Sequence, residues 1–330
     1  MLAQRLTPGD EIRIIAPSTS MAVVKGKQID LAVNRLNDLG FKVTFGKYSE
    51  NHDEFFSTTV KERIADLHDA FTDQKVKAVL TAIGGYNANQ LLRHIDYDLI
   101  ADNPKIFCGY SDITSLQLAI YRKTGLVTYS GPHFSSFGVK HGFEYTLKSF
   151  LEAVTNDAPF EIEPSEVWSD DPWFLEQEQR NFVQNTGYTI LQEGTAAGKL
   201  IGGNLSTINL LQGTEYMPSL HNSILFIEDD EETHARIFDR QLQSLLHQPD
   251  AAGIKAILIG RFQKDSQITD TALRQIIASK SELRGIPVIA NVNIGHVQPF
   301  ATVPIGSTAT VTAVSSNVEI TIDQVEYNES

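Results

Sequence analysis

The sequence feature that most constrains the fold is a unit of buried strand, turn and amphipathic helix that repeats in the first part of the chain. Residues 12–18 are typical of a strand that ends in a turn, and apolar residues then recur at helical spacing over 29–39. Residues 41–45 alternate as in a strand, a capping box precedes the helical pattern of 60–71, and residues 76–83 form another apolar strand. This repetition predicts an α/β fold with a Rossmann-like parallel sheet covered by helices on both faces, whose functional loops gather at the carboxyl ends of the strands.

Two turns that follow such strands contain residues suited to a functional site. Gly84 and Gly85 let the backbone approach a ligand closely, so an amide of this turn could supply half of an oxyanion hole, although an ordinary tight turn explains the pair equally well. The pair lacks both the lysine of a Walker loop and the glycine spacing of a dinucleotide fingerprint. Ser111 lies between an apolar run and a helical pattern, where a hydroxyl is exposed beside the first helical amides. It is therefore a candidate nucleophile; the alternative is that Ser111 or Asp112 only caps the helix.

The second half of the chain has more β character. Residues 198–205 predict a strand and a glycine turn with Asn204 as a helix cap, and the buried strand 224–227 ends at Glu228. Residues 311–322 alternate as in an antiparallel hairpin. We therefore expect a smaller, β-rich C-terminal domain beside the first sheet.

The segment 158–185 differs from both halves, because it holds several prolines, an acidic irregular middle and both tryptophans, Trp168 and Trp173. Such a long stretch without clear periodicity predicts a crossover between domains. Each tryptophan either packs the crossover onto the body or offers a stacking surface to a flat ligand. The predicted parts are a nucleophile domain over 1–150, a crossover and catalytic loop over 151–188, and a C-terminal domain over 189–330.

Composition excludes several functional classes. The 330 residues include 42% hydrophobic and 21% charged residues, and no apolar run approaches the ~20 residues of a membrane span. The start of the chain has no secretory pattern, so we expect a cytoplasmic protein. The single cysteine, Cys108, precludes an internal disulfide. A net charge of −14 disfavours nucleic acid and anionic membranes as partners and leaves small molecules as the expected partners.

Three residues together suggest acyl transfer: Ser111 on a strand-to-helix turn, Glu228 at the end of an apolar strand, and His296 after a glycine in a loop. A serine hydroxyl needs an imidazole to take its proton, and the imidazole needs a carboxylate on its other nitrogen. Two other interpretations remain open. His296 is then a structural histidine, and residues 228–232 are a solvated acidic run or a weak metal site.

Five sequence blocks resemble successive signatures of the LD-carboxypeptidase family of serine peptidases. They span nearly the whole chain and are Gly84-Gly85-Tyr86-Asn87, Gly109-Tyr110-Ser111-Asp112, 198–204, Phe226-Ile227-Glu228-Asp229 and Gly295-His296. The crossover with its Trp-Ser-Asp-Asp stretch, and the block that follows it, are more similar to the microcin C self-immunity branch than to the branch that trims cell-wall peptides.

The resemblance implies a catalytic triad of Ser111, Glu228 and His296, and an oxyanion hole made by the backbone amides of Gly85 and Asp112. It also implies an active site in the cleft between two domains, a homodimer, and a reaction that needs no metal and no cofactor. Enzymes of the self-immunity branch cleave the amide-type bond between an aspartyl group and a modified adenylate. On this analogy one of Trp168 and Trp173 stacks on the purine.

By the same analogy Asn204 contacts the substrate, which is a small peptide or a peptidyl-nucleotide. One departure concerns charge, because residues 229–232 are all acidic where a basic group would hold a substrate carboxylate; Arg236 is the nearest candidate for that role. The rival activity within the family is release of terminal D-alanine from murein tetrapeptides. A rival from another class is a non-catalytic two-domain protein that binds a small molecule.

Overall fold

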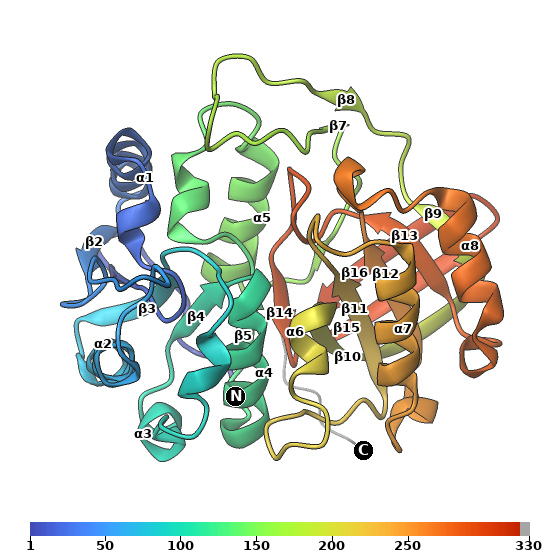
Figure 1. Ribbon diagram of the computed structural model, residues 1–330, viewed down its shortest axis with the longest axis horizontal. Helices are drawn as coiled ribbons and strands as arrows, with labels where there is room; N and C mark the ends of the chain where they lie inside the picture. The colour runs from blue at the N-terminus through green and yellow to red at the C-terminus, as the bar shows by residue number, and fades with distance from the viewer. Residues whose placement is uncertain (324–330) are drawn as a thin grey trace.

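The protein is described by a computed structural model over residues 1–323, in which two sheets stand side by side (Figure 1). Residues 324–330, the end of the predicted C-terminal domain, lie outside the described residues. Over residues 1–323, no helix combines the length and the apolar character that a membrane crossing requires.

The first sheet confirms the predicted parallel, Rossmann-like arrangement. Its strand order is β14-β5-β4-β3-β1-β2, and every neighbouring pair is parallel except β14 with β5. The strands are β1 (Glu11–Ile15), β2 (Lys42–Phe45), β3 (Val76–Thr81), β4 (Ile106–Gly109), β5 (Thr128–Ser130) and β14 (Val303–Ile305).

Helices cover both faces of this sheet, as the repeated units predict. Figure 1 shows α1 (Gly26–Asp38) and α5 (Glu144–Thr155) above the sheet. The opposite face carries α2 (Val60–Thr72), α3 (Tyr97–Asp102) and α4 (Thr114–Thr124). The capping box forms at the start of α2, where the Thr59 hydroxyl accepts a hydrogen bond from the Glu62 amide at 3.3 Å.

The second sheet has a parallel centre and antiparallel flanks, which confirms the β-rich C-terminal region. Strands β10 to β13 are mutually parallel, whereas β15, β16, β6 and β9 join them antiparallel. In sheet order the strands are β6 (Phe160–Glu161), β16 (Asn317–Asp323), β15 (Thr308–Val314), β10 (Gly194–Asn204), β11 (Ser223–Glu228), β12 (Ala256–Gly260), β13 (Val288–Val292) and β9 (Thr189–Gln192). Its helices are α6 (Leu205–Asn209), α7 (Ala235–Leu246) and α8 (Asp270–Ser279).

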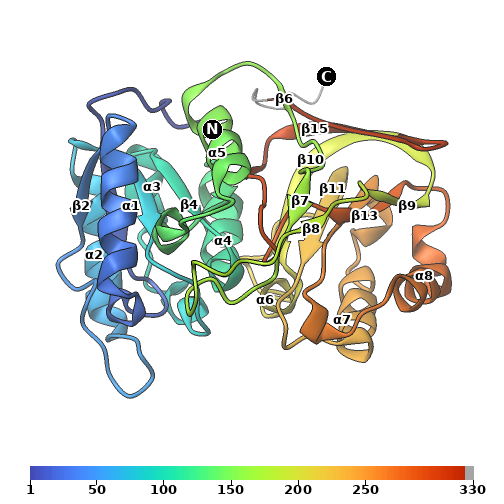
Figure 2. The ribbon, with the colours of Figure 1, turned by 90° about the horizontal axis from the view of Figure 1, so that it is seen from above.

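The crossover runs over both halves of the molecule, as the view from above shows (Figure 2). It contains the short antiparallel pair β7 (Val167–Trp168) and β8 (Val183–Gln184). Two features differ from the predicted division at residues 150 and 189. Helix α5 continues to Thr155, and β14, from the C-terminal part of the chain, completes the edge of the first sheet.

The two halves dock where the start of α4 meets the end of β10. The Thr114 hydroxyl accepts a hydrogen bond from the Asn204 backbone amide at 3.1 Å. A Cβ atom at Gly203 would lie only 2.5 Å from the Thr114 hydroxyl oxygen, so glycine is required for this approach. The contact brings the carboxyl end of β4, where Ser111 follows, to the carboxyl end of β11, where Glu228 lies.

The pairing of β10 with β11 depends on a second glycine. A Cβ atom at Gly202 would lie 1.7 Å from the carbonyl oxygen of Phe226, its partner in the register. We therefore expect Gly202→Ala to lower the free energy of unfolding by more than about 3 kcal/mol, because the two strands must separate. Urea unfolding followed by circular dichroism measures the loss.

The matched control is Gly285→Ala, since Gly285 also has positive φ, +84°, but an added Cβ meets no atom within 4 Å. Its cost is only the backbone strain, about 1 to 2 kcal/mol. Equal unfolding midpoints for the two variants would show that the contact at Gly202 does not hold the strands together.

Candidate active site

Ser111 is the first residue of the 3-10 helix Ser111–Ile113, at the strained turn that follows β4. Its φ of +61° is rare for a residue with a side chain and costs about 1 to 2 kcal/mol. Gly84 leaves room for it, because a Cβ there would lie 3.0 Å from the Ser111 Cβ and 3.1 Å from its Oγ. The turn therefore holds the hydroxyl away from β4 and against the Gly84-Gly85 loop.

Three side chains from separate segments form one chain of hydrogen bonds. His296 Nε2 lies 3.1 Å from Ser111 Oγ, and His296 Nδ1 lies 2.6 Å from Glu228 Oε2. The Glu228 side chain is only 4% exposed and that of His296 17%. Both distances are within hydrogen-bond reach, so this arrangement permits proton transfer from the hydroxyl to an imidazole that is oriented by a carboxylate.

The electrostatics of the site favour the charged imidazole. Burial lowers the pKa of His296, but the Glu228 carboxylate outweighs it, so the pKa is raised to about 9. A cation that forms on His296 when it accepts a proton is therefore stabilised where it arises.

The loop that carries His296 is anchored on both sides. Asn293 donates hydrogen bonds to Ser165 Oγ at 2.8 Å and to the Pro299 carbonyl at 3.0 Å. The backbones of Ser169 and Gln298 exchange two hydrogen bonds, of 2.7 and 2.9 Å. These bonds thus fix the histidine loop to the crossover.

An aromatic cluster beside the triad was not predicted as part of the site. The Tyr110 ring stacks on His133 at 4.3 Å and meets His296 edge-on at 5.1 Å. His133 is buried, its Nδ1 lies 2.7 Å from the Thr81 hydroxyl, and its Nε2 has no hydrogen-bond partner. Burial, with a smaller effect of His296, lowers the pKa of His133 to about 3, so it stays neutral. Its position just after β5 is a signal that could have placed it at this sheet edge.

Ser111 opens into a cavity of about 400 Å³ between the two halves, here called the nucleophile cavity. Its lining comes from the Gly84-Gly85 loop, the nucleophile turn, α6, the acidic run after β11, and α7. The residues are Gly85, Tyr86, Ser111, Asp112, Asn204, Ser206, Thr207, Leu210, Asp230, Glu232, Thr233, Ile237 and Gln241.

Both predicted oxyanion-hole residues line the nucleophile cavity. Gly85 has φ +151°, and a Cβ there would lie 2.3 Å from both the Ser18 and Thr19 hydroxyl oxygens. The Asp112 carboxylate is engaged within the protein, where it accepts hydrogen bonds from Ser18 Oγ at 2.5 Å and from the Ala88 backbone amide at 2.8 Å. The Asp112 side chain thus holds the turn in place, while its backbone amide remains at the start of the helix.

Asn204 also lines this cavity, but most of its amide is engaged within the protein. Its oxygen caps α6 by accepting a hydrogen bond from the Thr207 amide at 3.0 Å, and its nitrogen donates to Asp229 at 3.1 Å. The buried Asp229 carboxylate has one oxygen without a partner. Burial and the adjacent Glu228 raise the pKa of Asp229 to about 6.

Neither tryptophan belongs to the lining of the nucleophile cavity. The Trp168 ring lies under two cations, the Arg261 guanidinium at 4.9 Å and the Lys264 ammonium at 5.1 Å. Trp173 is half-buried and packs edge-on against Phe174 at 6.2 Å. Arg236, the expected cation for a substrate carboxylate, is exposed on α7 and does not reach the cavity.

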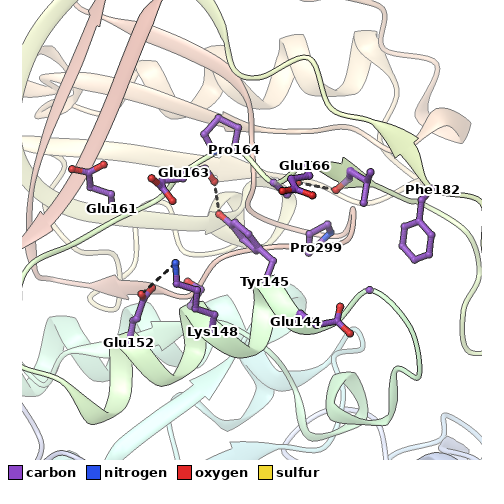
Figure 3. Close-up of a pocket in the computed structure, with 14 residues that line it drawn as sticks. Glu144, Tyr145, Lys148, Glu152, Glu161, Glu163, Pro164, Glu166, Phe182 and Pro299 are labelled. Carbon is purple, nitrogen blue, oxygen red and sulfur yellow. Dashed lines mark hydrogen bonds and ion pairs between the residues drawn. The ribbon is translucent and has the colours of Figure 1, made fainter.

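A second hollow, of about 440 Å³, lies between α5 and the start of the crossover (Figure 3). Glu144 and Glu152 face it from α5, and Glu161 and Glu163 from the opposite wall. None of the three triad residues lines it. Within residues 1–323, no group of three or more His, Cys, Asp or Glu side chains is arranged to hold a metal ion.

Comparison with known proteins agrees with this architecture. The LD-carboxypeptidase N-terminal domain matches residues 12–131, and the LD-carboxypeptidase C-terminal domain matches residues 197–311. This chain belongs to the LD-carboxypeptidase family. The chain is 53% identical to the putative carboxypeptidase YocD of Bacillus subtilis, over 98% of this chain and 100% of that protein.

More distant members of the LD-carboxypeptidase family include both activities that the sequence suggests. A probable murein peptide carboxypeptidase of Bacillus subtilis is 33% identical over 96% of this chain and 92% of that protein. The microcin C7 self-immunity protein MccF of Escherichia coli is 31% identical over 97% of this chain and 96% of that protein.

Solved structures similar to this chain include MccF and MccF-like proteins, in agreement with the resemblance seen in the sequence. The MccF-like protein of Bacillus anthracis has a TM-score of 0.96 and 52% identity, over 98% of this chain and 99% of that chain. MccF in complex with aspartyl sulfamoyl adenosine has a TM-score of 0.88 and 29% identity, over 99% of this chain and 100% of that chain.

The raised pKa of His296 predicts the pH dependence of Ser111 reactivity. Only the neutral imidazole accepts a proton, so the rate at which a fluorophosphonate labels Ser111 should rise with pH up to about 9 and then level off. In Glu228→Gln the rising limb should move toward pH 6.5, the ordinary value for histidine, and the maximal rate should fall about 10³-fold or more. If the rising limb of the Glu228→Gln profile lies at the same pH as that of the natural protein, Glu228 does not control the pKa of His296.

The contribution of the His296–Glu228 pair to stability should fall as pH rises, whereas the reactivity of Ser111 should increase. Because the folded-state pKa of His296 lies above its unfolded value, the His296–Glu228 pair stabilises the fold fully below about pH 6.5 and loses this contribution as pH rises through 9. The difference in Tm between the natural protein and Glu228→Gln should therefore shrink over this range in thermal melts.

Proposed function

We propose that this protein is a serine amidohydrolase in which Ser111 is the nucleophile, His296 the general base and Glu228 the orienting acid. The observation that carries the proposal is the continuous contact from Ser111 Oγ through both nitrogens of His296 to the buried carboxylate of Glu228. A nucleophile, a base and a carboxylate linked in this order are characteristic of acyl transfer.

The reaction runs in two half-reactions. Ser111 Oγ attacks the substrate carbonyl carbon while its proton passes to His296 Nε2, and the imidazolium is stabilised by Glu228. The tetrahedral intermediate then breaks its carbon–nitrogen bond, and His296 returns the proton to the leaving nitrogen. Water, deprotonated by His296, hydrolyses the acyl-enzyme and restores Ser111.

The negative oxygen of the intermediate would be held by the backbone amides of Gly85 and Asp112. Both residues line the nucleophile cavity beside Ser111, and the Gly85 amide donates no hydrogen bond to another described residue. One such donor typically contributes about 3 to 4 kcal/mol to the lowering of the barrier.

The bond we propose as the target links an aminoacyl group, expected to be aspartyl, to a modified adenylate. Similarity over nearly the whole chain to MccF, solved with aspartyl sulfamoyl adenosine, supports this choice. Asn204 would contact the substrate through the edge of its amide that faces the cavity. Stacking of the purine by Trp168 or Trp173 stays a prediction, as do the homodimer and the cytoplasmic location.

Release of terminal D-alanine from murein tetrapeptides is the second candidate, supported by the similarity to a murein peptide carboxypeptidase. A protein that only binds a ligand between its halves is disfavoured, because Ser111 and His296 lie within hydrogen-bond reach.

Ser111→Ala tests the proposed nucleophile. We expect the variant to lose at least about 10³-fold in kcat for aspartyl sulfamoyl adenosine, while ligand binding by calorimetry and the unfolding midpoint stay unchanged. A murein tetrapeptide assayed in parallel identifies the substrate class. Retained hydrolysis of either compound by Ser111→Ala would exclude Ser111 as nucleophile.

A further inference from the structure

The charged groups that face the nucleophile cavity all carry one sign. Of its lining residues, Asp112, Asp230 and Glu232 are the charged ones, and none is basic. Asp112 is occupied by internal hydrogen bonds, which leaves Asp230 and Glu232 for a ligand. Arg236, the second residue of α7, is exposed and lies outside the lining.

Within residues 1–323, neither of these two carboxylates forms a salt bridge with a lysine or an arginine, although Asp230 contributes to the raised pKa of His296. Asp230 accepts one hydrogen bond, from the Glu232 amide at 3.0 Å. Glu232 accepts one, from the Tyr86 hydroxyl at 2.7 Å, and this bond joins the Gly84-Gly85 loop to the acidic run after β11. Each carboxylate keeps acceptor capacity and no basic side chain pairs with it.

Two neighbouring groups point to the same kind of ligand. Gln241 lines the cavity, and its buried amide oxygen has no hydrogen-bond partner. The buried Asp229 carboxylate lies behind the lining, where it accepts hydrogen bonds from the Asn204 side-chain nitrogen at 3.1 Å and from Ser206 Oγ at 3.2 Å. Both groups add to a negative field at the cavity wall, which is complementary to a cationic ligand.

The position of the cavity determines which part of a substrate meets these groups. Ser111, Gly85 and Asp112 line it, so the scissile carbonyl would lie at its wall. The α-carbon bonded to that carbonyl carries the α-amino group and the side chain of the acyl residue, so these groups would share the cavity with Asp230 and Glu232.

We propose that Asp230 and Glu232 bind an ammonium group of the acyl residue, and that Glu232 is the residue that sets this charge preference. The proposal rests on the proposed function and refines it, because a side-chain ammonium would be favoured over the aspartyl carboxylate expected from family resemblance. The ammonium belongs either to the α-amino group or to the side chain.

Four sulfamoyl adenosines distinguish these sources: lysyl, Nα-acetyl-lysyl, norleucyl and aspartyl. We expect kcat/KM to be about tenfold or more higher for lysyl than for aspartyl, a modest factor because Glu232 is solvent-exposed. A drop from lysyl to norleucyl assigns the side-chain ammonium, and a drop from lysyl to Nα-acetyl-lysyl assigns the α-ammonium.

The variant Glu232→Lys should reverse the preference between lysyl and aspartyl substrates, and Glu232→Gln should abolish it while keeping a hydrogen bond to Tyr86. The matched control is Glu231→Lys, which makes the same change of charge at an exposed neighbour outside the cavity lining. If Glu231→Lys and Glu232→Lys change the preference equally, or if natural protein prefers aspartyl, the proposal is wrong.

Binding to Ser111→Ala, measured by calorimetry with the same four compounds, separates this proposal from the proposed function. Charge-dependent binding without hydrolysis by the natural protein would overturn the hydrolase and support the ammonium site. Hydrolysis at equal rates for all four compounds would support the hydrolase and overturn the ammonium site. Absence of both binding and hydrolysis would overturn both proposals.

Discussion

The contact on which the rest of the site depends is the close approach of β10 to the start of α4. Gly203 lies against Thr114, and the Asn204 amide donates to the Thr114 hydroxyl. No side chain fits between the two halves at this point, so the carboxyl ends of β4 and β11 are held next to each other. Ser111 comes from one end and Glu228 from the other, which makes the candidate triad a property of the docked halves.

The same docking concentrates negative charge around a single imidazole. Glu228 and Asp229 are buried at the end of β11, and Asp230 and Glu232 follow at the rim of the nucleophile cavity. A buried carboxylate is costly unless it is paired, and His296 supplies the partner of Glu228. One arrangement of charge therefore raises the pKa of the proposed base and makes the cavity beside the nucleophile attractive to cations.

Sequence reasoning located residues whose position follows from strand ends. Glu228 ends a buried strand, and Ser111 and Gly85 lie in the turns that follow two others, so parallel strands bring all three to carboxyl edges of the sheets. Residues whose role depends on packing were not found. Tyr110 contacts His296, and His133 stacks on Tyr110 because β4 and β5 are neighbours, whereas Gln298 holds the histidine loop through its pairing with the crossover. The tryptophans were assigned to the ligand by resemblance, but the folded crossover places neither in the cavity lining.

By itself the sequence determined the parallel sheet, the C-terminal hairpin, the family and the identity of the polar residues at strand ends, because these follow from local periodicity and from short motifs. Only the tertiary structure decided that His296 reaches both Ser111 and Glu228, that Arg236 lies outside the cavity lining, and that the cavity beside Ser111 has acidic walls. The reason is physical: distances between segments far apart in the chain depend on how two sheets dock, and that docking is set by side-chain and backbone contacts across the interface rather than by any local pattern.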